Sequence, residues 1–289
     1  MKWNPFNHKI GLALGGGAAK GIAHIGVIKA FDEKNIKISY LSGTSIGALV
    51  ASYYAFGKPV DDIRRISSGL SFTSLIGLSI PKQGIFSTNS IKDMILNDLG
   101  DVNIEDADIP LAICTSDIKT GEQVVFRKGN LADAVCASVA VPGIFIPVEI
   151  NGRTLVDGGI TENVPVSPLD EMGAGITVAI NLNGIISYQE PKDLVAIMGN
   201  AIDIAIDLRT REQLKKADVT LSLDLGEFSR FGNADEYERL YERGYYLAQE
   251  KLSTLFWFKR ARYLYFLKKL ISSILPFKIP NILHIKKYL

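Results

Sequence analysis

The stretch SGTSIGA, residues 42–48, contains the first residues whose types and spacing are suited to chemistry. Ser45 lies between Gly43 and Gly47 in a Gly-x-Ser-x-Gly pattern, which is typical of a nucleophilic serine on a tight strand-to-helix turn. Glycine is frequent in this chain, so about one random chain in six of its composition carries the pattern by chance. An ordinary turn rich in small residues therefore stays an alternative, and a catalytic interpretation needs partners elsewhere.

A second glycine-rich turn, GGGAAKG at residues 15–21, follows an apolar run and opens a helical pattern. It fails the phosphate-loop pattern because Gly21, not a hydroxyl residue, follows Lys20. It also fails the Gly-x-Gly-x-x-Gly dinucleotide pattern. What remains is a run of exposed backbone N–H groups at a helix N-terminus, which stabilises either a phosphate or the oxyanion of acyl transfer.

A nucleophilic serine needs a base, and the chain has only three histidines. His284 lies in a basic tail, His8 lies in the N-terminal extension, and His24 lies in the first turn of a predicted helix, where a structural role is expected. A Ser-His-Asp triad is therefore disfavoured. A carboxylate that acts directly on Ser45 becomes the leading interpretation.

Asp157, in LVDGG at the end of a predicted strand, is the best-placed carboxylate. The alternative is that Asp-Gly simply forms a turn. An unperturbed aspartate, with a pKa of about 3.9, is a poor base at neutral pH, so Asp157 would need burial to raise its pKa. Composition leaves Asp117, Asp133 and Asp170 open as rivals.

Apolar runs and turn residues predict the elements that must position these groups. Residues 8–14 and 37–43 are typical of buried strands, and each precedes a glycine-containing turn and a helical pattern, which predicts an α/β fold that begins with a parallel sheet. Residues 67–98 form either a mobile flap over an apolar groove or an ordinary surface excursion. The other predicted strands are 109–118, 122–129, 153–159, 175–182 and 218–225, and the predicted helices are 22–35, 45–56, 131–145 (halted at Pro142) and 235–250.

Composition places the chain among globular proteins, with 47% hydrophobic and 22% charged residues. Cys114 and Cys136 lie in apolar runs and are expected to be reduced core residues of a cytosolic protein, not parts of a disulfide framework or metal site. The charge-free run 38–57 is long enough to span a bilayer, but its Ser, Gly and Tyr content favours a buried strand and helix. The glycines at 15–17 argue against a signal peptide.

The C-terminal segment differs in charge from the rest of the chain. Residues 251–289 hold nine of the 32 Lys and Arg residues and no Asp or Glu, which leaves the other 250 residues with a balance of −8. The alternation of aromatic, aliphatic and basic residues in this segment favours an interfacial helix on anionic lipid. The alternative is a helix docked on the acidic body, whose charge argues against a nucleic-acid partner.

Four motifs in this order, GGGAAKG, GTSIG, ASVAVP and DGG, resemble those of the patatin-like phospholipase family, especially its bacterial branch related to neuropathy target esterase. The resemblance covers roughly residues 9–250, and the ordered set is far more specific than any one motif. It implies an α/β fold of three layers, with a central, mostly parallel sheet flanked by helices. The implied organisation is an N-terminal extension (1–8), a hydrolase domain (9–250) and a basic, aromatic, helical C-terminal extension (251–289).

By this resemblance the catalytic Ser-Asp dyad of the family carries over to Ser45 as nucleophile and Asp157 as general base. The oxyanion hole of the family carries over to Gly16, Gly17 and Ala18. The residues that support the oxyanion loop carry over to Gly15, Lys20 and Gly21. The elbow carries over to Gly43 and Gly47. Two residues depart from the family pattern. Lys20 replaces the usual arginine, and Ala18 replaces the third glycine of the oxyanion loop but keeps its backbone N–H.

The resemblance implies that the chain hydrolyses acyl esters of phospholipids or lysophospholipids through an acyl-enzyme, with no metal or other cofactor. The alternatives are a neutral-lipid or soluble-ester hydrolase, and a membrane-associated regulator without turnover. We expect a cytoplasmic protein that binds the inner face of the membrane peripherally through residues 251–289, with no nucleic-acid partner.

Overall fold

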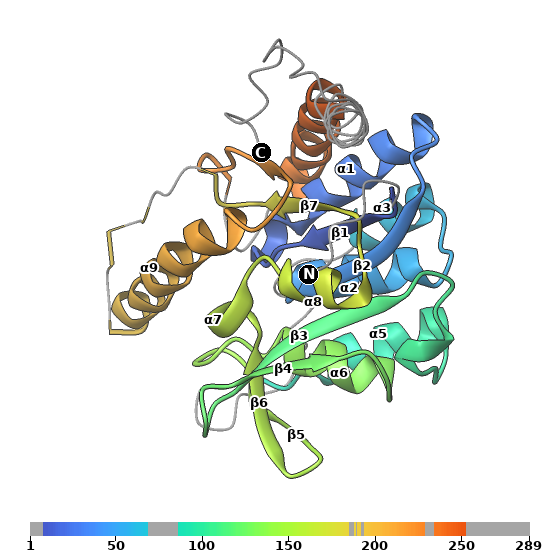
Figure 1. Cartoon of the computed structure of the whole chain (residues 1–289). Helices are drawn as coiled ribbons and strands as arrows, with labels where there is room; N and C mark the ends of the chain where they lie inside the picture. Colours follow the sequence, from blue (N-terminus) through green and yellow to red (C-terminus); the bar gives the residue numbers. More distant parts are fainter. Residues whose placement is uncertain are drawn as a thin grey trace, which may run out of the picture.

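One eight-stranded sheet lies at the centre of the molecule, between helices on both of its faces (Figure 1). The structure, a computed structural model, describes residues 8–68, 86–184, 188, 190–191, 194–228 and 234–252. The predicted N-terminal extension up to residue 7, residues 69–85 of the predicted flap region, and residues 253–289 of the C-terminal segment lie outside the described residues.

The strands and helices alternate along the chain, as the apolar patterns predict. The strands are β1 (Ile10–Leu14), β2 (Ile38–Thr44), β3 (Leu111–Asp117), β4 (Gln123–Phe126), β5 (Val148–Ile150), β6 (Arg153–Asp157), β7 (Ile176–Asn181) and β8 (Val219–Ser222). The α-helices are α1 (Ile22–Glu33), α2 (Ile46–Ala55), α3 (Val60–Ser68), α5 (Asn89–Leu99), α6 (Leu131–Ser138), α7 (Gly159–Glu162), α8 (Ser167–Met172), α9 (Leu194–Leu214) and a last helix over residues 237–252. Short 3-10 helices lie at Ala18–Gly21, Ile104–Asp106 and Ala234–Glu236.

The sheet is mostly parallel, as the resemblance implied. Its order is β5-β6-β3-β2-β1-β7-β8, with β4 also paired to β3. The pairs β1–β2, β1–β7, β2–β3 and β7–β8 are parallel, whereas β3–β4, β3–β6 and β5–β6 are antiparallel. The parallel pairs form one side of the sheet, and the antiparallel pairs gather around β3.

Strands β2 and β6 meet end to end along one edge of β3. In the register, Thr44 of β2 lies opposite Cys114, and Asp157 of β6 lies opposite the next residue, Thr115. Strand β4 pairs with β3 over the same stretch, so it occupies the other edge of β3 and leaves β2 and β6 to share one edge. Because β6 runs against β2, the carboxyl ends of these two strands face each other.

Side chains that alternate along the strands build a core on each face of the sheet. In β1, Leu12 and Leu14 belong to the larger core, which includes buried residues of α1, α2, α3, α5, α6 and the last helix. Ala13, between them, belongs to a smaller core on the opposite face, with Val164 and with Leu169 of α8. The two cores and the sheet give the three layers that the resemblance implied.

The structure corrects one predicted helix and describes part of the predicted flap. The helix predicted over 131–145 ends at Ser138, because the chain turns so that the carbonyl of Ala140 accepts a hydrogen bond from the N–H of Asp157. Within the predicted flap region, residues 89–98 belong to helix α5, so this part is an ordinary surface helix.

Two predictions about apolar runs are confirmed. The charge-free run 38–57 forms strand β2 and helix α2, and Cys114 and Cys136 are buried and unpaired. None of the helices in the described ranges has the length and apolar character that a bilayer crossing requires.

Candidate active site

Ser45 lies between β2 and α2 on a turn with a strained backbone. Its φ of 55° and ψ of −127° lie in a region that residues with a Cβ rarely occupy, at a cost of about 1–3 kcal/mol. The turn is tight because helix and strand pack without side chains between them. A Cβ on Gly47 would lie 2.1 Å from the carbonyl oxygen of Leu14, and one on Gly43 would lie 2.5 Å from Cα of Ala48. Only glycine fits at these two positions.

Hydrogen bonds on both sides of Ser45 hold this turn in place. The N–H of Ser45 donates to Oγ of Ser138 over 2.8 Å, and that hydroxyl donates to the carbonyl of Cys114 over 2.7 Å. The carbonyl of Ser45 accepts the N–H groups of Ala48 and Leu49 in the first turn of α2. Ser45 is 8% exposed, so the residue is almost completely buried.

Asp157 ends β6 and lies beside Ser45, where the two strands meet. The Ser45 side chain lies close enough to the Asp157 carboxylate to lower its pKa, and the N–H of Gly159 donates to Asp157 Oδ1 over 2.7 Å. The carboxylate is buried, with 7% of the residue exposed. Burial raises the pKa of Asp157 to about 6, against the opposing effects of the Ser45 side chain and the Gly159 N–H.

The three rival carboxylates lie elsewhere and have other partners. Asp117 is buried at the end of β3, where its Oδ1 accepts the backbone N–H of Lys119 and its Oδ2 lies 3.6 Å from Nη1 of Arg153. Asp133 forms an ion pair with Lys92 over 2.7 Å. Asp170 lies on α8, where burial raises its pKa. Of the four carboxylates that the sequence left open, the structure brings Asp157 together with the serine.

The glycine-rich loop adjoins Ser45, but one of its amides is already used. A Cβ on Gly16 would lie 3.4 Å from Cβ of Ser45, which places the loop directly over the serine. The N–H of Gly16 donates to the carbonyl of Asn163 over 3.1 Å. The hydrogen of this amide, which the resemblance assigned to the oxyanion hole, therefore points at a carbonyl of the protein.

Gly17 and Ala18 begin the short 3-10 helix Ala18–Gly21, where N–H groups have no acceptor within the helix. Ala18 has a φ of 51°, the left-handed conformation that glycine adopts more readily. This explains why the resemblance places a glycine at this position. Alanine accepts the same conformation at a cost of about 1 kcal/mol.

His24 supports the loop from the side of α1. Its Nε2 lies 2.8 Å from the carbonyl oxygen of Gly15, and complete burial lowers the pKa of His24 to about 4. The ring is therefore neutral, and its N–H fixes the loop rather than the serine. His8 is exposed at the start of the described chain, and His284 lies outside the described residues.

Lys20, the residue that replaces the usual arginine, is buried. Burial raises the pKa of Asp207 on α9, and the positive charge of Lys20 lowers it by a smaller amount. Tyr188 and Asn183 donate hydrogen bonds to the same carboxylate, over 2.9 Å and 3.4 Å. The loop is thus coupled electrostatically to helix α9.

Two further residues lie at this site, and no motif assigned a role to either of them. Ser138 carries the hydrogen bond that holds the serine turn. Asn163 lies between the loop and the aspartate turn: its Oδ1 lies 2.7 Å from where a Cβ on Gly16 would be, and 3.3 Å from where one on Gly159 would be. The Nδ2 of Asn163 is buried and has no hydrogen-bond partner within the described part of the chain. Its position six residues after Asp157 is the one signal that the sequence offers.

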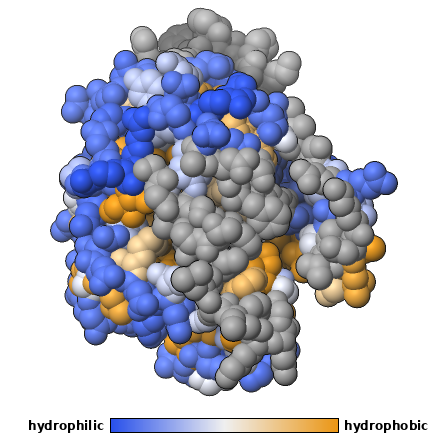
Figure 2. Space-filling view, turned by 180° about the vertical axis from the view of Figure 1, so that it is seen from behind, coloured by the Kyte–Doolittle hydropathy of each residue, from blue (hydrophilic) through white to orange (hydrophobic). Residues whose placement is uncertain are grey.

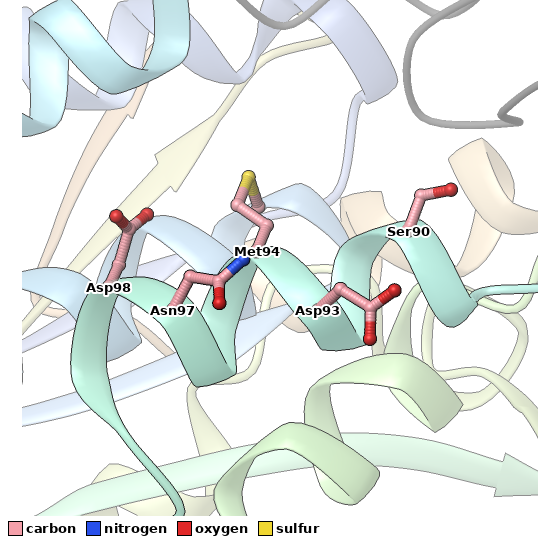
Figure 3. Close-up of a pocket in the computed structure, with 5 residues that line it drawn as sticks. All are labelled: Ser90, Asp93, Met94, Asn97 and Asp98. Atoms are coloured by element: carbon pink, nitrogen blue, oxygen red, sulfur yellow. The ribbon is translucent and has the colours of Figure 1, made fainter.

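A surface hollow lies apart from these residues. It is lined by one side of α5, whose side chains Figure 3 shows along a single helix face: Ser90, Asp93, Met94, Asn97 and Asp98. None of these residues belongs to the serine, aspartate or glycine turns. In the described ranges, no three His, Cys, Asp or Glu side chains lie close enough to form a metal site.

Comparison with protein families identifies the region that contains these motifs. The family model for patatin-like phospholipase matches residues 12–170, which include Ser45, Asp157 and the glycine-rich loop. An uncharacterized NTE family protein of Mycobacterium bovis is 37% identical over 179 residues, which cover 61% of this chain and 49% of that protein. The chain therefore spans about half the length of this relative.

Longer relatives match over the same share of the chain. Neuropathy target esterase sws of Drosophila melanogaster is 32% identical over 183 residues, and Lysophospholipase NTE1 of Yarrowia lipolytica is 32% identical over 184 residues. Each match covers 61% of this chain and 13% of the relative.

Solved structures support the fold. VipD from Legionella pneumophila superposes with a TM-score of 0.59 at 18% identity, over 86% of this chain and 67% of that chain. The type III effector protein ExoU superposes with a TM-score of 0.50 at 16% identity, over 89% of this chain and 54% of that chain. At such low identity these likenesses show a shared fold.

Proposed function

Because the chain belongs to the patatin-like phospholipase family, we propose that it hydrolyses acyl esters of lipids with Ser45 as nucleophile and Asp157 as general base. The observation that carries this proposal is the meeting of the two strand ends, which brings the Ser45 side chain beside a buried carboxylate whose pKa burial raises to about 6. Such a carboxylate is still ionised at neutral pH, yet it is a much stronger base than an exposed aspartate.

The first half of the reaction transfers the acyl group to the serine. Oγ of Ser45 attacks the ester carbonyl carbon while its proton passes to the Asp157 carboxylate. The tetrahedral intermediate collapses, the bond to the lipid alcohol breaks, and the alcohol leaves with the proton from Asp157. In the second half, water gives a proton to Asp157 as it attacks the acyl-enzyme, and the fatty acid leaves as the proton returns to Ser45.

The negative charge of the tetrahedral intermediate needs donors in fixed positions. We assign this role to the N–H groups of Gly17 and Ala18, which open the 3-10 helix beside Ser45. The amide of Gly16 is left out, because it binds the carbonyl of Asn163. Its bond shapes the loop from which the other two amides project.

The carboxamide of Asn163 acts as a positioning group between the loop and Asp157. An unpaired buried N–H costs about 1–3 kcal/mol, so its retention beside the site suggests a partner that appears during the reaction. A water or a substrate oxygen next to the Gly16 turn fits this description. The carbonyl of the same residue fixes the loop, so Asn163 links both halves of the site.

The lipid class is proposed from the relatives. Two are named as neuropathy target esterase and lysophospholipase, which favours a lysophospholipid or phospholipid. The reaction as derived uses no metal. Peripheral binding to an anionic membrane through residues 251–289, on the cytoplasmic face, is the corresponding proposal for location; it rests on charge and composition alone.

Fatty-acid release from lysophosphatidylcholine in EDTA tests the function directly. We expect wild type to release fatty acid, and both Ser45→Ala and Asp157→Asn to lose nearly all activity. If Asp157→Asn keeps its activity, the dyad assignment is wrong. If wild type hydrolyses a short-chain aryl ester but no phospholipid, the lipid class is wrong; if it hydrolyses neither, the chain is a non-catalytic member of the family.

A further inference from the structure

Helix α9 has the reverse of the polarity expected for a surface helix. Surface helices of globular proteins turn apolar residues inward and polar residues to solvent. In α9, the buried residues over positions 207–213 are polar: Asp207, Thr210 and Gln213. Five large apolar residues on the other side are between 43% and 70% exposed: Leu194, Ile197, Met198, Ile204 and Leu208. These five residues are called the α9 stripe below.

The stripe is continuous along the helix. Its members and the exposed Ala201 and Ala205 recur at spacings of three and one, so they share one face over four turns. No charged residue interrupts this face before Arg209. Figure 1 shows α9 at the edge of the molecule, where it extends beyond α7. On the face that Figure 2 shows, hydrophobic residues lie in patches among hydrophilic ones.

The polar face of α9 is fixed to the candidate active site. Nε2 of Gln213 donates to the carbonyl of Thr161 over 3.1 Å, and Cδ1 of Ile206 lies 3.5 Å from where a Cβ on Gly159 would be. The N–H of Gly159 in turn binds Asp157. The helix is therefore held in place by hydrogen bonds on its inner side, while within the described part of the chain its outer side has no apolar covering.

We propose that the α9 stripe docks onto a phospholipid membrane and holds the active site against the surface that contains its substrate. The purpose of this docking rests on the proposed function, because it assumes a lipid substrate. The vesicle-binding test below does not depend on that function. Directly after the stripe, residues 209–216 contain four Lys or Arg residues and one Glu. An apolar face that runs into a basic end matches an anionic interface, where the apolar side chains enter the acyl boundary and the basic ones meet headgroups.

Size favours a membrane over a second copy of the chain. A face of four helical turns is about 20 Å long and about 10 Å wide, or about 200 Å². A stable protein interface buries about 800 Å² on each partner. The stripe is too small to hold a dimer, whereas insertion of a few side chains into lipid needs no complementary surface.

Binding of the full-length chain to vesicles of phosphatidylcholine and phosphatidylglycerol tests the proposal. The Ser45→Ala background keeps the lipid intact, so the result does not depend on turnover. We expect Ile197→Asp with Leu208→Asp to weaken vesicle binding by about tenfold or more. The matched control is Tyr246→Asp, which changes another exposed hydrophobic residue, 64% exposed on the last helix, and should leave binding within about twofold.

A fluorescent label reports which face contacts the lipid. Cys114 and Cys136 are buried, and burial raises the pKa of both thiols, so an environment-sensitive dye attaches to an introduced cysteine instead. We expect the emission of a dye on Met198→Cys to shift to the blue when vesicles are added. A dye on Tyr246→Cys should not shift. A dye at position 198 that stays in water while the protein is vesicle-bound overturns the proposal.

Two other partners could cover the α9 stripe, a second copy of the chain or the chain's own residues 253–289, and each would give a different result. If the wild-type chain is a dimer in solution and the Ile197→Asp, Leu208→Asp variant is a monomer, the stripe binds a second copy and the proposal is wrong. If the dye at position 198 is already shielded without lipid, and removal of residues 253–289 exposes it, the chain covers its own stripe. With Ser45 intact, the Ile197→Asp, Leu208→Asp variant should hydrolyse a soluble aryl ester at the wild-type rate. That result separates the loss of membrane docking from a loss of catalysis by the dyad.

Discussion

Ser45 and Asp157 lie at the ends of two strands that meet head to head along β3. Each strand end has an energetic cost, and the two costs differ in kind. The serine turn is strained in its backbone, with a φ of 55°, and depends on glycines that let the helix approach the strand. The aspartate turn is relaxed: Gly158, the next residue, has an ordinary helical φ of −65°. Its cost is electrostatic, because a carboxylate is buried and its pKa rises to about 6.

This difference follows from what each group must do. A nucleophile must project its oxygen toward substrate, which is a demand on geometry, and strain in a tight turn meets it. A base must hold a proton briefly near neutral pH, which is a demand on pKa, and burial meets it. The two ends should therefore respond differently to substitution, and each prediction below separates geometry from charge.

The largest effect is expected when the charge of Asp157 is removed. Asp157→Asn keeps the size of the side chain but cannot accept the serine proton, so kcat/KM for lysophosphatidylcholine should fall by about a thousandfold or more. Asp170→Asn removes a rival carboxylate on α8 and should keep wild-type activity. Equal losses in both variants would mean that the general electrostatic field, rather than this one carboxylate, matters.

The next effect falls on the fold at the serine end. In Gly47→Ala, the new Cβ would overlap the backbone oxygens of Leu14 and Gly15, so the free energy of unfolding should fall by about 3 kcal/mol. Chemical denaturation measures this. The control is Gly199→Ala in α9, where a Cβ meets no atom and alanine should stabilise the helix by up to about 1 kcal/mol. A tolerated Gly47→Ala would mean that the turn is looser than described.

At the aspartate end the same kind of measurement should show a gain. The pKa of Asp157 is higher in the folded chain than in the unfolded chain, so the folded state binds a proton more readily, and stability falls as pH rises from about 4 to 6. Above pH 6 the full penalty is present. Asp157→Asn removes it, so at pH 7 the variant should be more stable than wild type by about 3 kcal/mol, and most of the gain should vanish near pH 4. A loss of stability at pH 7 would contradict the electrostatic account.

The smallest effect is expected between the two ends. Asn163→Ala keeps the backbone carbonyl that binds Gly16 but removes the carboxamide, so kcat should fall by about tenfold with little change in KM. Asn97→Ala, on the exposed face of α5, is the control. A change in KM alone would indicate a role in binding rather than in positioning the reacting groups.

Much of the fold could be predicted from the sequence because its strands are short apolar runs bounded by glycine turns. Strands β1 and β2 and helix α1 follow this rule closely. Helix α6 did not, since small residues continue past Ser138 and only the bond between Ala140 and Asp157 ends the helix. Helix α9 was not predicted either, although the residues of the α9 stripe recur at helical spacing.

The sequence pointed to Ser45 and Asp157 by motif, but it could not supply their proximity. That depends on β2 and β6 sharing one edge of β3, through pairings between residues 70 positions apart (β2 with β3) and about 40 positions apart (β3 with β6) along the chain. The use of the Gly16 amide by Asn163 is likewise a tertiary contact without a local signal. Ala18 replaces the glycine that the family pattern has at this position. Its left-handed φ gives the physical reason why glycine is usual there.

The rate at which a fluorophosphonate labels the chain, measured by intact mass across pH, tests the dyad most directly. We expect one adduct on Ser45 and no adduct in Ser45→Ala. The labelling rate should rise with pH and reach half of its maximum near pH 6, where Asp157 loses its proton. In Asp157→Asn the rate should be low at every pH. An adduct on another residue, or a Ser45 rate that ignores pH between 5 and 7, would contradict the pairing of this serine with this aspartate.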